Sequence, residues 1–268
     1  MADQDLRERQ REHFNSIAGR YQAARRNANH LLLKDLMWAH ALRGMDRFRG
    51  QKVEVLEPLC GFADGKSIIE RYLCDNVEYS GYDYSEKVIE LLKDQHPQIN
   101  CWTADATKFD PLPGHYDIVI LLGGLHHVPD YAALVVEKSA RALKPGGIFI
   151  NLEPTSGNVV SRKIREAIYR RNSLFDERTE RDFGCGELFA MFENAGLRRL
   201  RITHPGLLSY VLYYNPDAFP RLNLGGLGAV RRAFSVDKPF LESAIGRFFS
   251  FATLSVWERP LQATSASG

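Results

Sequence analysis

Short apolar runs alternate with amphipathic stretches along the middle of the chain. Five runs are typical of strands: residues 53–57, 77–82, 99–104, 116–122 and 148–152. Between these runs, apolar residues recur at helical spacing at 66–73, 85–94 and 129–143. Ser85 stands at the N-cap position of the second predicted helix, and a turn at Lys144-Pro-Gly-Gly147 ends the third. Strands that alternate with helices predict right-handed βαβ crossovers and a parallel sheet.

The chain carries further elements at both ends. Helical periodicity marks the first fifty residues, and the second half continues with a helix at 186–195 and strands at 198–203 and 249–257. We therefore predict an α/β fold: a doubly wound, seven-stranded, mostly parallel (Rossmann-like) sheet with an N-terminal helical extension and helical lid insertions. In this scheme residues 1–50 form the cap, 51–268 form the sheet domain, and 154–182 and 205–248 are lids over a substrate.

Acidic residues follow three successive predicted strands. Glu57 ends the first strand, and Asp83 and Asp105 come directly after the second and third. Doubly wound sheets bind their ligands beyond the carboxyl ends of the strands, so these side chains are expected at one edge of the sheet. Aspartate is also a common turn residue, which offers a second explanation for each position taken alone. Three acids at one edge favour a single bound ligand.

The run Val55-Leu-Glu-Pro-Leu-Cys-Gly-Phe-Ala-Asp-Gly65 resembles the first motif of class I S-adenosylmethionine-dependent methyltransferases, an acidic residue followed by G-x-G-x-G. Leu59 and Ala63 stand at the first and third glycine positions, and Gly61 is retained. The resemblance implies that S-adenosyl-L-methionine is the cofactor, with Glu57 facing its ammonium and Asp83 its ribose hydroxyls. It further implies that the cofactor is contacted by Leu59, Gly61, Tyr84 (on the adenine), Asp105, Ala106 and Leu122.

A second resemblance indicates one branch of these methyltransferases. The run Leu121-Leu-Gly-Gly-Leu-His-His-Val-Pro-Asp130 is similar to the L-H-H-x-x-D segment of UbiE- and BioC-like methyltransferases, and the Lys144-Pro-Gly-Gly147 turn resembles its usual partner. Residues 13–21 resemble the opening helix of that branch, which makes Tyr21 a further cofactor contact. The resemblance covers residues 13–155 and implies direct SN2 methyl transfer to a small-molecule acceptor.

Three residues near the strand ends are candidates for the catalytic role: His126, His127 and Glu153. A general base is needed only if the acceptor arrives protonated, and either histidine could instead be a packing residue or shape the acceptor pocket. The insertions carry a basic set of residues, Arg162, Arg165, Arg170 and Arg171, and an apolar set, Tyr210, Leu212, Tyr213, Tyr214 and Phe219. Together the two sets suit an acceptor with an apolar body and an anionic group. A solvated helix face explains the basic set equally well.

Composition narrows the remaining alternatives. A formal net charge of +2 gives no global field for a nucleic-acid partner. The chain has no signal-peptide pattern and no apolar stretch of about 20 residues, so we expect a cytoplasmic protein without integral membrane association. Its four cysteines have no zinc-site spacing, so no metal is expected, and the sequence leaves the oligomeric state open.

The predicted fold and the loop after the first strand leave three other functions to consider. A phosphate-binding P-loop is excluded because three residues, not four, separate Gly61 and Gly65. A nicotinamide-dependent oxidoreductase would share the fold and Asp83, but it gives no role to Glu57 or Asp105. A non-catalytic protein that binds S-adenosylmethionine as a scaffold stays open at this point.

Overall fold

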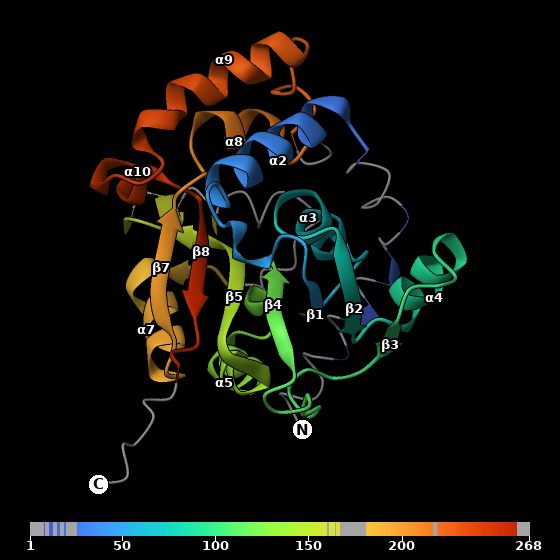
Figure 1. Cartoon of the computed structure of the whole chain (residues 1–268). Helices are drawn as coiled ribbons and strands as arrows, with labels where there is room; N and C mark the ends of the chain where they lie inside the picture. The colour runs from blue at the N-terminus through green and yellow to red at the C-terminus, as the bar shows by residue number, and fades with distance from the viewer. Residues whose placement is uncertain are drawn as a thin grey trace, which may run out of the picture.

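The computed structural model describes residues 8, 11, 12, 15, 16, 19, 26–159, 161–163, 165, 166, 181–216 and 219–261. Seven strands within these residues lie in the order β3-β2-β1-β4-β5-β8-β7 (Figure 1). Their bounds are β1 Lys52–Pro58, β2 Asn76–Asp83, β3 Cys101–Thr103, β4 Tyr116–Leu122, β5 Leu143–Ser156, β7 Arg198–Thr203 and β8 Ala252–Glu258. Strand β8 is antiparallel to its neighbours β5 and β7, and the other pairs are parallel. The predicted doubly wound, mostly parallel sheet is confirmed.

Helices surround this sheet within the described residues. Their bounds are α2 Ala28–Ala41, α3 Asp64–Tyr72, α4 Glu86–Gln95, α5 Ala132–Ala142, α7 Cys185–Asn194, α8 Leu208–Tyr213, α9 Leu227–Asp237 and α10 Ala244–Phe249. Short 3-10 turns are η1 Asp46–Phe48, η2 Leu125–His127, η3 Pro129–Tyr131 and η4 Lys238–Phe240. The predicted cap of α4 is confirmed, because the Ser85 side chain accepts a hydrogen bond from the backbone N–H of Val88 at 3.2 Å.

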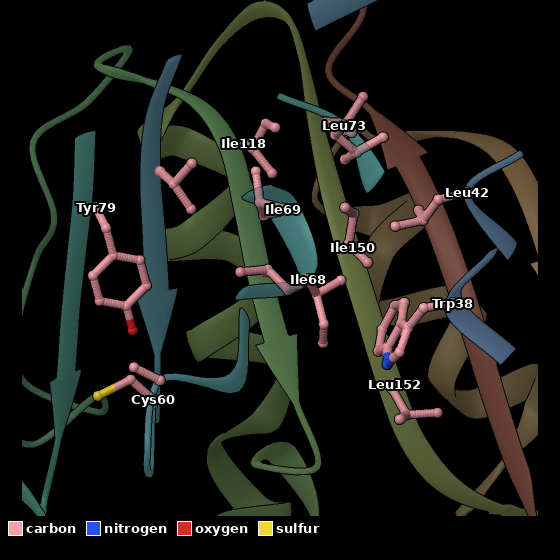
Figure 2. Close-up of a cluster of buried hydrophobic side chains, with 14 of the residues drawn as sticks. Trp38, Leu42, Cys60, Ile68, Ile69, Leu73, Tyr79, Ile118, Ile150 and Leu152 are labelled. Carbon is pink, nitrogen blue, oxygen red and sulfur yellow. The ribbon is translucent and has the colours of Figure 1, made fainter. Parts of the chain in front are cut away.

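Successive residues of the central strands point to opposite faces, and both faces are buried. In β4, Ile118 and Ile120 belong to the cluster under α2, α3 and α4, whereas Val119 and Leu121 belong to the cluster under α5 and α7. Figure 2 shows the first cluster, in which Trp38 of α2 lies beside the end of β5. Burial on both faces explains why the central strands are continuous apolar runs in the sequence.

The fifth strand is longer than predicted. The prediction of a turn at 144–147 is wrong, because β5 begins at Leu143 and continues to Ser156. Both ends of the strand find partners: the N–H of Gly146 donates to Arg259 at 2.7 Å, and Thr155 pairs with Phe183 of the two-residue strand β6 (Phe183–Gly184). As a consequence Glu153 lies inside a strand. The predicted last strand also starts later, at Ala252, because residue 249 still belongs to α10.

A helical cap covers the carboxyl edge of the parallel strands (Figure 1). Helices α2, α8 and α9 share a buried cluster that includes Leu33, Tyr213 and Phe234. Asp237 at the end of α9 caps α8, since its carboxyl oxygens accept from the N–H groups of Leu208 at 3.2 Å and Ser209 at 2.7 Å. The segment predicted as the second lid therefore contains ordered helices. The domain boundaries themselves stay a prediction.

Candidate active site

The loop between β1 and α3 is built around the carboxyl group of Glu57, which is 1% exposed. Its Oε1 accepts from the N–H of Gly65 at 3.0 Å, and its Oε2 accepts from the hydroxyl of Tyr79 at 2.7 Å. A Cβ on Gly65 would lie 2.6 Å from the Glu57 carboxyl carbon, so the approach requires glycine. Burial raises the pKa of Glu57 from 4.5 to about 8, and the hydrogen bonds from Tyr79 and Gly65 oppose that rise. Glu57 thus holds the first turn of α3 against the strand.

The backbone of this loop is left-handed at three alternate positions. Leu59, Gly61 and Ala63 have φ values of 53°, 50° and 59°. These are the three glycine positions of the motif, and a non-glycine residue in this region costs about 1–3 kcal/mol. The loop therefore keeps the conformation of a glycine motif although two of the glycines are replaced. The Leu59 side chain packs against Gly124, where a Cβ would lie 2.8 Å from the Leu59 Cβ.

Asp83 connects the ends of the first two strands. Its Oδ2 accepts from the N–H of Gly61 at 3.0 Å, and its Oδ1 accepts from the N–H of Ser85 at 2.9 Å. Burial raises the pKa of Asp83, and the backbone donors of Ser85 and Gly61 oppose the rise. The carboxylate therefore fixes the position of the Gly61 loop relative to α4.

The third acidic position follows β3. Oδ1 of Asp105 accepts from the backbone N–H of Thr107 at 2.9 Å and from its hydroxyl at 2.7 Å. This geometry is that of an Asx turn, so the turn explanation accounts for one carboxyl oxygen. The N–H of Ala104 donates to the carbonyl of Asp83 at 2.9 Å, which brings the ends of β2 and β3 together. Ala106 is buried beside them, and Leu122 is half-buried at the end of β4.

Residues from the N-terminal part of the chain contact this edge. The Tyr84 hydroxyl donates to Glu8, and the Arg11 guanidinium lies 5.5 Å from the centre of the Tyr84 ring. The hydrogen bond to Glu8 raises the pKa of Tyr84 to about 12. The predicted contact Tyr21 lies outside the described residues, and its role stays a prediction.

The second polar group of the site lies where β4 and β5 end. Oε1 of Glu153 accepts from the N–H groups of Gly124 at 3.0 Å and Leu125 at 2.8 Å. Its Oε2 lies 2.9 Å from Nδ1 of His126, and the Glu153 side chain is fully buried. Burial lowers the pKa of His126 to about 3 and raises that of Glu153 to about 8, so the pair carries no net charge between these two values. The ring of His127 lies 3.9 Å from that of His126 between centroids.

Arg165, in the segment predicted as the first lid, lies close enough to His126 to affect its pKa. It is 9% exposed, and its guanidinium donates to the carbonyls of Thr155, at 3.1 Å, and Phe251. Its Nε lies 3.7 Å from a carboxyl oxygen of Asp182. The explanation of Arg165 as part of a solvated helix face is therefore wrong, because the side chain ties the segment after β5 to the start of β8. Arg162 is exposed, whereas Arg170 and Arg171 lie outside the described residues.

The chain is similar in sequence to known methyltransferases. Residues 56–149 match the methyltransferase domain family. A demethylmenaquinone methyltransferase from Bacillus cytotoxicus is 29% identical over 183 residues, which is 60% of this chain and 76% of that protein. The chain carries a methyltransferase domain and is an S-adenosylmethionine-dependent methyltransferase. The matched relative places the methyltransferase with the UbiE-like branch, and the nicotinamide alternative is thereby removed.

Solved structures agree with this assignment at the level of the fold. A candidate methyltransferase from Haloferax volcanii superposes with a TM-score of 0.60 at 18% identity, covering 92% of this chain and 97% of that one. A phosphoethanolamine N-methyltransferase from Haemonchus contortus, solved with S-adenosyl-L-methionine, superposes with a TM-score of 0.55 at 15% identity, covering 84% of this chain and 52% of that one. S-adenosyl-L-methionine is the cofactor of the methyltransferase.

The residues at the carboxyl edge fit such a cofactor. A Cβ built on Gly61 would meet no atom of the described residues within 4 Å, so the loop leaves open space beside it. Carboxyl groups of Glu57, Asp83 and Asp105, at or just after the ends of β1, β2 and β3, lie at the same edge of the sheet, and carboxyl oxygens suit the ammonium and hydroxyl groups of such a cofactor. The side-chain roles assigned from the sequence stay predictions.

Several residues of the methyltransferase site were missed in the sequence. Tyr79 lies in the middle of β2 and gave no signal, although its hydroxyl holds Glu57. Gly124 belongs to the 121–130 motif, but its contact with Leu59 depends on a loop 65 residues away in the sequence. Asp182 lies in the first insertion and contacts Arg165. No local pattern marks these positions, because each acts through a tertiary contact.

Proposed function

We propose that the methyltransferase methylates a small, lipophilic acceptor, and that His126 removes the acceptor's proton with Glu153 as its partner. The observation that carries the proposal is the hydrogen bond between Glu153 and His126 at the carboxyl end of β4 and β5. When bound, S-adenosylmethionine supplies an activated methyl group. What the protein must add is the alignment of the acceptor, exclusion of water and, for a protonated acceptor, a base.

The protonation chemistry of the pair supports this role. Nδ1 of His126 is bonded to Glu153, which leaves Nε2 as the ring atom that takes up a proton. Burial raises the pKa of Glu153 to about 8, so that the pair loses its second proton as the pH passes through that region. The backbone donors Gly124 and Leu125 hold the carboxylate in place once it has formed. The deprotonated pair is the form that acts as the base.

The cap supplies an apolar wall for the acceptor. Tyr210 and Tyr214 are stacked with ring centres 4.1 Å apart, and both pack against the sheet cluster as well as the cap cluster. Leu122 borders the same sheet cluster at the end of β4. Tyr213, by contrast, is buried in the cap and donates to the carbonyl of Leu224 at 3.2 Å, so its role is structural. Two stacked aromatic rings favour an acceptor with an apolar or aromatic body.

The test is methyl transfer itself, followed as release of S-adenosylhomocysteine from a panel of phenols, acidic carbon compounds and amines with and without an apolar tail. For a hydroxyl acceptor we expect kcat to rise with pH through about 8. Glu153→Gln should abolish this rise, and His126→Asn should lower kcat by about 100-fold to 10,000-fold, the usual contribution of a positioned base. His115→Asn, at a half-buried histidine that directly precedes β4, is the matched control.

Two results would overturn the proposal. If both variants retain the wild-type rate and pH profile, the pair is structural and the acceptor is deprotonated in another way. If S-adenosylmethionine binds in calorimetry and only acceptors without an apolar tail are methylated, the proposal of a lipophilic acceptor is wrong.

A further inference from the structure

Apolar side chains are concentrated on the outside of the cap. Among the described residues, fifteen large hydrophobic side chains are exposed, and ten of them lie between Leu208 and Phe249. This segment holds α8, α9, η4 and α10, which form the rim of the molecule above the sheet (Figure 1). Exposed apolar residues that cluster in this way mark an interaction surface more often than a solvated one.

Helix α10 presents the clearest apolar face. Ile245, Phe248 and Phe249 occur at positions i, i+3 and i+4, so they share one side of the helix, and they are 57%, 50% and 60% exposed. The opposite side packs onto η4, where a Cβ on Gly246 would overlap the carbonyl of Phe240. The helix is therefore fixed to the cap by its small residue and leaves its aromatic residues outside.

The charge beside this face is positive. Residues 219–251, all of them described, contain five basic residues and two acidic ones. Both acids are engaged: Asp237 is buried as the cap of α8, and Glu242 lies 2.9 Å from Arg43. Along α9 the buried side carries Val230 and Phe234, whereas Arg231, Arg232 and Val236 face outward.

We propose that this outer cap face, formed by Arg231, Arg232, Val236, Ile245, Phe248 and Phe249, docks on the surface of an anionic lipid bilayer. Aromatic residues next to arginines are the composition of interfacial helices, in which the rings enter the acyl boundary and the cations face the headgroups. Charge complementarity favours this occupant over a second copy of the chain, because a two-fold contact would place one cationic face against another. No helix within the described residues is long and apolar enough to cross a bilayer.

The position of α10 gives the docking a consequence for the site. The helix is joined through Ser250 and Phe251 to β8, whose Thr253 pairs with Glu153. The proposed docking face is therefore connected by a short link to the strand that pairs with the proposed catalytic residue Glu153. Docking itself does not depend on the identity of the acceptor, so it can fail or succeed independently of the proposed function.

The experiment is co-sedimentation of the full chain with vesicles of phosphatidylcholine and phosphatidylglycerol, compared with phosphatidylcholine alone. We expect binding to the anionic vesicles that weakens as salt is raised. Arg231→Gln/Arg232→Gln should lower the partition coefficient by about 30-fold, the factor for two cations near an anionic surface. Phe248→Ser/Phe249→Ser should lower it by at least about tenfold, because two exposed rings no longer enter the interface.

Matched controls separate this face from general stickiness. Leu112→Ser/Leu261→Ser removes two exposed apolar residues outside the cap, and Lys87→Gln/Lys93→Gln removes two cations from α4, at the opposite edge of the sheet from α10 (Figure 1). Both controls should bind like wild type. Absence of binding, equal binding to neutral vesicles, or equal losses in the controls would each refute the proposal. A dimer in light scattering that Phe248→Ser/Phe249→Ser dissociates would assign the face to a second copy instead.

Discussion

The contact between Leu59 and Gly124 makes a quantitative prediction about the cofactor loop. The φ and ψ of Gly124 are −110° and −31°, which an alanine adopts without strain. The added Cβ would nevertheless lie 2.8 Å from both Cβ and Cδ1 of Leu59, and 3.3 Å from Cδ2 of Leu121. Gly124→Ala therefore tests whether the Leu59 side chain, at the first glycine position of the motif, leaves room only for glycine at position 124.

Two opposing effects set the magnitude. Replacing a glycine by alanine at a compatible backbone position stabilises a protein by about 0.4–1 kcal/mol through the unfolded chain. Overpacking against Leu59 costs about 1–3 kcal/mol. We expect Gly124→Ala to lower the free energy of unfolding by about 1 kcal/mol in the wild-type background, and to raise it by about 0.4–1 kcal/mol when Leu59→Gly is also present. The coupling between the two sites is then about 1–3 kcal/mol.

The measurement is a double-mutant cycle by urea unfolding. Leu59→Gly alone is uninformative, because relief of the left-handed backbone, about 1–2 kcal/mol, is offset by loss of a half-buried side chain. Calorimetry with S-adenosylmethionine on the same four proteins reports whether the loop shift reaches the cofactor. Gly186→Ala in α7 is the control, since a Cβ there would meet no described atom within 4 Å.

The reasoning is refuted if Gly124→Ala changes the free energy of unfolding equally in both backgrounds, within about 0.5 kcal/mol, the range in which independent sites add. Such a result would mean that the Leu59 side chain does not occupy the space in front of Gly124.

Three further predictions concern buried carboxyl groups. Burial raises the pKa of Glu57 to about 8, so the contribution of this group to the free energy of unfolding is complete below pH 4.5 and is lost as the pH rises towards 8. In urea titrations, Glu57→Gln should therefore flatten the decline of the free energy of unfolding between pH 6.5 and 8, and an unchanged slope would contradict this. Asp83→Ala leaves the N–H groups of Gly61 and Ser85 without their acceptor, so we expect a loss of about 1–3 kcal/mol of stability and weaker S-adenosylmethionine binding by calorimetry, with Asp94→Ala as the control that should change neither. Asp237→Ala removes the cap of α8 and should cost about 1–2 kcal/mol in urea unfolding; a loss no larger than that of exposed Glu242→Ala would speak against it.

Much of the fold was readable from the sequence because the central strands are buried on both faces. The apolar run at 116–122 predicts a strand, which the structure confirms, and the position of Ser85 predicts the cap that it forms. The extent of β5 was not readable, because its ends are paired by β8 and β6, which are distant in the sequence. Pairing partners of this kind leave no trace in local periodicity.

The conformation of the cofactor loop also depends on tertiary contacts that the local sequence does not show. Its glycine pattern is incomplete, yet Leu59 and Ala63 keep the left-handed backbone that glycines would adopt. The conformation is imposed from outside the loop: Glu57 binds the N–H of Gly65, and Asp83 binds the N–H of Gly61. Because these two carboxyl groups determine the course of the backbone, they can offset the cost of two non-glycine residues. The acidic residues at the strand ends are therefore stronger sequence signals of this site than the glycines, and a variant of either acid should disturb the loop more than restoration of glycine at position 59.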